Sequence, residues 1–220
     1  MSLAKKIGKN KSKPTDKAIA KKVKEAYGKS AIMVANAQKK VKANYDRIYT
    51  IAKAYMVVYS SYVLKKTKAS IREIERYQER MKDMEACVRG GWVSVGEMIG
   101  GIIRATTRNE CKMPDYKAQP FDEDEIRAKE LKRVNGDLNL AIYNCMCLKV
   151  LDLFRHELEV MAIVSLHDEL GWGRVRIQRF VDEIRGLFKT DMNRFKEICK
   201  ELVEKFKLTL DDDVKEIVNG

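Results

Sequence analysis

The sequence predicts an all-α protein, a helical bundle with a long N-terminal helical arm and a C-terminal helical hairpin around a Gly-x-Gly turn. Apolar residues recur at helical spacing along most of the 220 residues, whereas strand-like alternation is confined to a few residues near Trp92. Only three prolines and twelve glycines interrupt the pattern, which is too few for the frequent turns of an all-β design. Charged residues make up 35% of the chain, as is typical of helices with one exposed face.

Composition divides the chain into four segments. The first is rich in lysine and poor in apolar residues, so we expect it to be disordered. The third holds Pro114 and Pro120 in the longest irregular stretch and is expected to be a linker. The segments are a basic arm (1–13), an N-terminal helical region (14–105), the linker (106–121) and a C-terminal helical region (122–220).

Helix boundaries are predicted from capping residues and glycines. Ser70 and Glu73 have the spacing of a capping box, in which each side chain bonds the backbone amide of the other residue. Thr190 is placed to cap a later helix, and Gly90-Gly91 to end an earlier one. The expected helices run from Pro14 to about Tyr27, from about Ser30 to Lys66, from Ile71 to Val88, from Val95 to about Arg104, from Asp122 to about Asn135, from Asp137 to about Leu170, from Arg174 to Phe188, from Asp191 to Lys205 and onward from Thr209. The second and third are either separate helices or one continuous arm.

A heptad-like seam follows the second expected helix, with steps of three and four between apolar or aromatic residues. Its members are Val41, Tyr45, Ile48, Ala52, Tyr55, Tyr59 and Tyr62. Such a seam packs either into the core of the chain or against a second copy. A homo-oligomer formed through Val41 to Tyr62 is therefore one open alternative.

Positive charge is concentrated at the N-terminal end. The first 43 residues hold thirteen lysines and only two acidic residues, while the remaining residues are close to neutral. This asymmetry predicts a surface for a polyanion, with nucleic acid as the first candidate. The lysines expected to contact phosphates are Lys5, Lys6, Lys9, Lys11, Lys13, Lys17, Lys21, Lys22, Lys24, Lys39, Lys40 and Lys42.

A second candidate phosphate contact lies at the Gly-x-Gly turn. Glycines let a ligand approach the backbone, and the following helix begins with unpaired N–H groups that favour an anion. The expected contacts are Gly171, Gly173, Arg174, Arg176 and Arg179, arranged as a helix-turn-helix or a helix-hairpin-helix. The structural alternative is a plain helical hairpin, with Trp172 under the turn and a core stripe of Val175, Ile177, Phe180, Val181 and Ile184.

The same turn carries a resemblance to a known group of proteins. Residues 166–180 read Leu-His-Asp-Glu-Leu-Gly-Trp-Gly-Arg-Val-Arg-Ile-Gln-Arg-Phe. They resemble a Leu-His-Asp-x-Phe-Gly-Phe-Gly-x-x-Arg-x-x-Arg-Phe stretch of small helical proteins from phages and prophages of low-GC Gram-positive bacteria. Leu170 and Trp172 stand where that stretch has Phe, and the similarity covers at most the C-terminal third. The resemblance implies a phage origin and action inside a bacterial cell, without implying a chemistry.

Catalytic and metal-binding signatures are missing from the sequence. It contains no phosphate-binding P-loop, dinucleotide-binding fingerprint or nucleophile elbow. His156 and His167 are eleven residues apart on one expected helix, too far along it to share a metal ion. The five cysteines, with no secretory signal before them, indicate reduced thiols in a cytoplasm, and no apolar stretch is long enough to cross a membrane. We therefore expect no enzyme activity, no metal, no cofactor and no membrane association.

Two functional hypotheses of different classes remain, with a third behind them. The first is a non-catalytic intracellular protein that binds nucleic acid through the lysines and the basic helix after the turn. The second is an interaction protein that binds and inhibits an acidic host protein or a nucleoprotein, for example in a defence system. The third is a structural coiled-coil assembly factor built on the Val41–Tyr62 seam.

Overall fold

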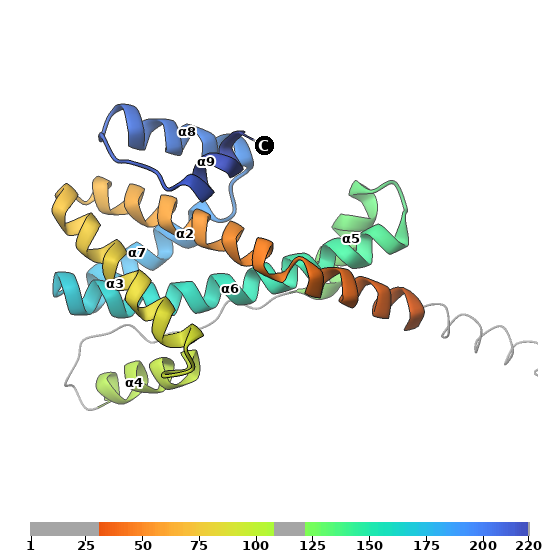
Figure 1. The fold of residues 1–220 in the computed structure, drawn as a ribbon, viewed down its shortest axis with the longest axis horizontal. Coiled ribbons are helices and arrows are strands. Elements are labelled where there is room, and N and C mark those ends of the chain that lie inside the picture. Colours follow the sequence, from red (N-terminus) through yellow and green to blue (C-terminus); the bar gives the residue numbers. More distant parts are fainter. Residues whose placement is uncertain (1–30, 108–121, 220) are drawn as a thin grey trace, which may run out of the picture.

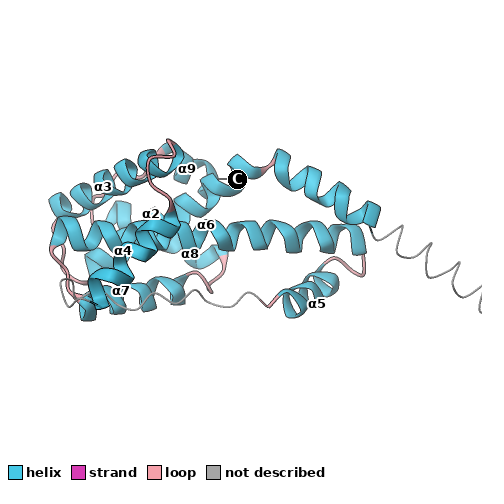
Figure 2. Cartoon of the chain, turned by 90° about the horizontal axis from the view of Figure 1, so that it is seen from below, coloured by secondary structure: helices cyan, strands magenta, loops and turns pink. Residues whose placement is uncertain are grey.

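The computed structural model of the chain describes residues 31–107 and 122–219, and every regular element within them is a helix (Figures 1 and 2). The predicted arm at residues 1–13, the helix from Pro14 to Tyr27 and most of the linker lie outside these residues. The helices are α2 (Tyr45–Lys66), α3 (Ile71–Arg89), α4 (Val95–Thr107), α5 (Glu123–Arg133), α6 (Leu138–Leu170), α7 (Arg174–Leu187), α8 (Met192–Glu204) and α9 (Asp212–Asn219), preceded by helical residues 31–43.

The central element is α6, whose 33 residues give it a length of about 50 Å. The Asp137 side chain caps its start by accepting a hydrogen bond from the Leu140 N–H. Gly171 ends it in the left-handed conformation, with φ of 61°. Both boundaries agree with the prediction from the sequence, because each depends on local capping chemistry.

The other helices pack around α6 as a bundle (Figure 1). α2, α3 and α7 contact α6 directly, while α8 and α9 pack on α2. An aromatic cluster of Tyr55, Tyr59, Phe188 and Phe195 joins α2 to the segment around α8. One apolar core therefore draws residues from both sides of segment 108–121.

Most of the predicted seam is buried in this core. Ile48, Ala52, Tyr59 and Tyr62 are buried within the single chain, whereas Tyr45 is exposed and lies edge-on to the buried Phe154. The core alternative for the seam thus agrees with the structure. Little of the seam is left on the surface for a second copy to contact.

Several predicted boundaries need correction. The helix expected from Ser30 to Lys66 is interrupted by a turn at Asn44, whose side-chain amide donates to the Lys40 carbonyl oxygen. α2 and α3 are separate helices, since Ser70 and Glu73 form the capping box that starts α3. Asp191, rather than Thr190, caps α8 through the Arg194 N–H.

Two further corrections concern the ends of predicted elements. α4 continues to Thr107, so the first two residues assigned to the linker are helical. Val175 is 63% exposed, although Ile177, Phe180, Val181 and Ile184 form the expected core stripe of α7. Val175 precedes the buried Ile177 by two residues, about 200° around the helix, so it lies on the face opposite the stripe.

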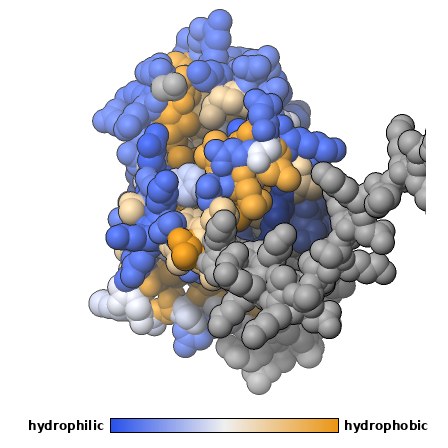
Figure 3. Space-filling view, turned by 90° about the vertical axis from the view of Figure 1, so that its right-hand side faces the viewer, coloured by the Kyte–Doolittle hydropathy of each residue, from blue (hydrophilic) through white to orange (hydrophobic). Residues whose placement is uncertain are grey.

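The surface of the described residues is mixed rather than continuously apolar. In Figure 3, which views the molecule from the right-hand side of Figure 1, hydrophilic side chains surround scattered apolar ones. The most exposed large apolar residue in the described ranges is Trp92, at 87%, in the turn between α3 and α4. None of the described helices has a stretch that is both long and apolar enough to cross a bilayer.

Candidate nucleic-acid interface

The predicted phosphate contacts fall into three groups. Lys5, Lys6, Lys9, Lys11, Lys13, Lys17, Lys21, Lys22 and Lys24 lie outside the described residues. Lys39, Lys40 and Lys42 are exposed on the helical residues 31–43. Gly171, Gly173, Arg174, Arg176 and Arg179 are exposed at the turn between α6 and α7, which we call the arginine turn (residues 171–179).

The two described groups lie at opposite ends of α6. Lys39 and Lys40 share a groove with Asn139 and Tyr143, which belong to the first two turns of α6. Gly171 follows the last residue of the same helix. The 32 residues from Asn139 to Gly171 correspond to about 48 Å along the axis. The lysines and the arginine turn therefore cannot contact the same phosphate group.

The N-terminal end of α6 lies between residues 31–43 and α5 (Figure 2). We call this region, comprising residues 31–47 and the first turns of α6, the basic end. No acidic side chain of the described residues lies within ion-pair distance of Lys39, Lys40 or Lys42. Within the described part of the chain these three side chains are exposed.

The nearby acidic helix α5 does not neutralise these lysines. Glu123 of α5 accepts from Lys149 of α6 at 3.0 Å, and this contact lowers the pKa of the Glu123 carboxyl. Glu130 binds Arg133 on its own helix and accepts a hydrogen bond from Asn144 of α6. These acidic side chains of α5 are thus paired with bases of α5 and α6.

The groove at the basic end is open to solvent, and Met33, Ala37 and Ala43 make part of its lining apolar. Its volume is about 600 Å³, and its lining combines Lys39 and Lys40 with Asn36, Asn139 and Tyr143. The Asn44 side-chain amide lies 3.4 Å from the Tyr143 hydroxyl oxygen, to which it donates. The turn at Asn44 therefore connects residues 31–43 to the aromatic side chain on α6.

The arginine turn has a regular backbone and an occupied interior. The Gly171 and Trp172 N–H groups donate to carbonyl oxygens of α6, and Gly173 is the N-cap of α7 without a side-chain cap. Trp172 is 5% exposed and packs edge-on against Phe180. Its other contact is the Arg176 guanidinium, which lies 4.9 Å from the centre of the indole ring. The core packing expected of a plain helical hairpin is thus present. The first three residues of α7 are nevertheless exposed to solvent.

Acidic residues beside the arginine turn are paired with α3. Glu169 binds Arg76 and Asp168 binds Arg80, each at 3.0 Å. Glu73, which caps α3, has its pKa lowered mainly by the Ser70 hydrogen bonds and to a smaller extent by Arg76 and Arg176. The acidic residues Asp168 and Glu169 are therefore already paired with arginines of α3.

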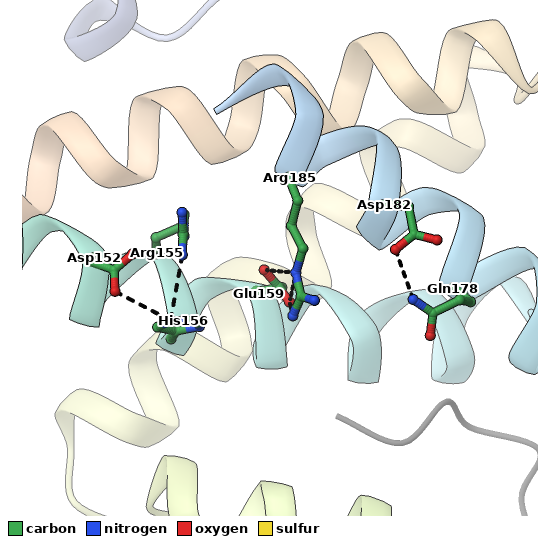
Figure 4. Close-up of polar contacts among 7 residues, drawn as sticks. All are labelled: Asp152, Arg155, His156, Glu159, Gln178, Asp182 and Arg185. Atoms are coloured by element: carbon green, nitrogen blue, oxygen red, sulfur yellow. Dashed lines mark hydrogen bonds and ion pairs between the residues drawn. The ribbon is translucent and has the colours of Figure 1, made fainter. Parts of the chain in front are cut away.

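A polar network between α6 and α7 was not anticipated from the sequence (Figure 4). Arg185 of α7 binds Glu159 of α6, which is only 2% exposed. Nearby, Asp152 pairs with Arg155 and contacts His156 at 3.4 Å. Arg185 is largely buried and joins α7 to α6 through this ion pair. In the sequence, this pair is indicated by Glu159, the one charged residue in the otherwise largely apolar run 158–166.

Metal-ligating clusters and reactive thiols were sought among the described residues. Within residues 31–107 and 122–219, no three histidine, cysteine or acidic side chains are grouped to hold a metal ion. Burial raises the pKa of Cys199 to about 11 and, with less effect, that of Cys145. Both thiols therefore remain protonated near neutral pH, where a nucleophilic cysteine needs a thiolate.

Comparisons with protein-family models, with curated proteins and with solved structures found no match to this chain.

Proposed function

We propose that the chain is a non-catalytic nucleic-acid-binding protein that engages phosphates through its lysine-rich N-terminal region. The observation that carries this proposal is the lack of ion pairs at Lys39, Lys40 and Lys42 among the described residues. Cations that the folded protein leaves unpaired release counterions when they bind a polyanion, and this release drives association. The phage origin and cytoplasmic location suggested by the arginine-turn resemblance belong to the same proposal.

The arginine turn serves as a second contact for a long polymer. Arg174, Arg176 and Arg179 are exposed, about 48 Å from the groove at the basic end. A duplex that reaches both regions spans about 14 base pairs at 3.4 Å per base pair. Shorter ligands contact one region at a time.

The proposal is tested by the salt dependence of binding. Fluorescence anisotropy with a labelled duplex is measured at several salt concentrations for the wild type and for a Lys39→Gln/Lys40→Gln/Lys42→Gln variant. Three lost phosphate contacts reduce the slope of log affinity against log salt by about 2.7. Lys189→Gln/Lys196→Gln/Lys200→Gln removes the same charge from exposed positions around α8 and keeps the wild-type slope. A salt-independent affinity, or equal slopes in both triple variants, would refute the proposal.

Binding of a host protein is the second candidate, and Trp92 is the observation that favours it. Its side chain is 87% exposed, and tryptophan is enriched where protein interfaces form. An inhibitor of a nucleoprotein would combine such a contact with the basic end. Capture of the same protein partner before and after nuclease treatment, and its loss with Trp92→Ala, would support this candidate over direct nucleic-acid binding.

A further inference from the structure

We infer that the groove at the basic end receives an unpaired base, so that the protein prefers single-stranded over double-stranded nucleic acid. This inference rests on the proposed function and adds the kind of strand that is bound. Its starting point is the cavity of about 600 Å³ between residues 31–43 and the first turns of α6. That volume lies within the range of about 300–1,000 Å³ typical of small-ligand pockets.

The side chains around the groove match the phosphate group and the base of a nucleotide. Lys39 and Lys40 supply positive charge for the phosphate group. Asn36 and Asn139 each offer an amide that both donates and accepts hydrogen bonds, as the edge of a base requires. Tyr143 supplies an aromatic ring on which a base can stack. No acidic residue is among the side chains that line this groove.

The Asn44 side chain joins the two walls of the groove, and its hydrogen bonds leave out the Lys39 and Lys40 ammonium groups and the face of the Tyr143 ring. The Asn44 amide donates to the Lys40 carbonyl oxygen and to the Tyr143 hydroxyl, which places the Lys40 backbone and the Tyr143 side chain on facing helices. The ammonium groups of Lys39 and Lys40 remain exposed. The site is therefore formed before the ligand arrives, which reduces the entropy lost on binding.

A concave site of this kind distinguishes strands by their geometry. In a duplex the bases are stacked on one another and their pairing edges are occupied, so only the phosphates reach the lysines. In a single strand a base can leave the stack and enter the groove, where its ring and its edge are both contacted. The lysines thus contribute to the affinity for both kinds of strand, while Tyr143 and Asn139 contribute to the affinity for the single strand alone.

The test compares Tyr143→Leu with Tyr143→Phe in the full-length chain. Anisotropy titrations use labelled oligothymidine, oligouridine and a duplex of the same length, with thermal unfolding as the control for folding. We expect Tyr143→Leu to weaken single-strand binding about tenfold and to leave duplex binding unchanged. Tyr143→Phe keeps the ring, and loss of the hydroxyl that accepts from Asn44 should reduce single-strand affinity far less than loss of the ring does. The DNA and RNA strands separate the two sources of the same chemistry.

A second variant covers the case in which Tyr143→Leu fails to fold. Asn139→Asp places an acidic side chain in the first turn of α6, where it favours the helix, and at the same time in the groove. It should weaken single-strand binding at least fivefold and duplex binding less. If both variants change the affinities for single-stranded and double-stranded ligands equally, or change neither affinity, the inference is wrong while the proposed function stands. If the wild type binds none of the ligands, the proposed function itself fails.

Discussion

Basic side chains lie near both ends of α6, but the groups that surround them differ. At the basic end, Lys39, Lys40 and Lys42 have no acidic partner among the described residues and lie beside an open groove. At the arginine turn, the interior is filled by Trp172, and the neighbouring acids are paired with arginines of α3. A basic side chain on a helix can therefore serve ligand binding or stability, depending on whether an acidic side chain of the protein pairs with it.

The strongest stability effect is expected from Arg185→Ala, because it leaves the buried Glu159 carboxylate without its partner. Removing one partner of a buried pair costs about 3–5 kcal/mol. Urea unfolding measures the loss, and Arg179→Ala, at an exposed position of the same helix, is the control with a change within about 0.5 kcal/mol. Equal effects of the two substitutions would show that Arg185 does not hold α7 on α6.

The length of the duplex separates the contributions that the two ends of α6 make to the affinity. In a variant with Arg174→Gln, Arg176→Gln and Arg179→Gln, affinity for a duplex well below about 14 base pairs should stay near the wild-type value. Affinity for a duplex of twice that length should fall, because only the longer ligand reaches both regions. Anisotropy titrations with the two duplexes provide the measurement. A large loss with the short duplex would mean that the arginine turn, rather than the basic end, is the main contact.

The two glycines of the arginine turn should respond differently to substitution. Gly171 has φ of 61°, so Gly171→Ala forces a side chain into the left-handed region at a cost of about 1–2 kcal/mol. Gly173 has φ of −86°, and a Cβ atom there meets nothing within 4 Å. Gly173→Ala should therefore lose only the N-cap preference for Gly over Ala, about 0.5–1 kcal/mol. The comparison is made by thermal unfolding, and a larger loss at Gly173 would contradict the conformation described for the turn.

The smallest effect is expected at Glu157, between the two ends of α6. Burial raises the pKa of its carboxyl above the ordinary value of 4.5, so the folded protein holds this proton more tightly than the unfolded chain does. The free energy of unfolding therefore falls as pH rises from that ordinary value through the raised pKa. Glu157→Gln removes this fall and stabilises the protein at neutral pH. Urea unfolding at acidic and neutral pH tests it, and a variant less stable than the wild type at neutral pH would be the contrary result.

Local signals in the sequence predict much of the helical organisation. Ser70, Asp137 and Gly171 mark their helix ends correctly, because capping depends on residues within one turn. The turn at Asn44 was missed, since neither glycine nor proline marks it and its cause is a side-chain hydrogen bond that competes with the helix.

The spatial relation of the candidate contacts could not be predicted in the same way. The sequence lists Lys39, Lys40 and the arginine turn as basic, but only the packing of residues 31–43 on α6 separates them by about 48 Å. The groove could not be predicted from the sequence either, because Asn36 and Tyr143 are more than a hundred residues apart in the chain. Residues of this kind become recognisable as a site only when the helices are placed side by side.

The two tryptophans give the molecule separate optical reporters. Trp92 is nearly bare to solvent, whereas Trp172 is enclosed beneath the Gly-x-Gly turn. A soluble quencher should extinguish the emission of the first and spare the second. Replacing either tryptophan by phenylalanine would leave one fluorescent indole in the chain. Contact at the α3–α4 turn and opening of the hairpin between α6 and α7 could then each be followed alone.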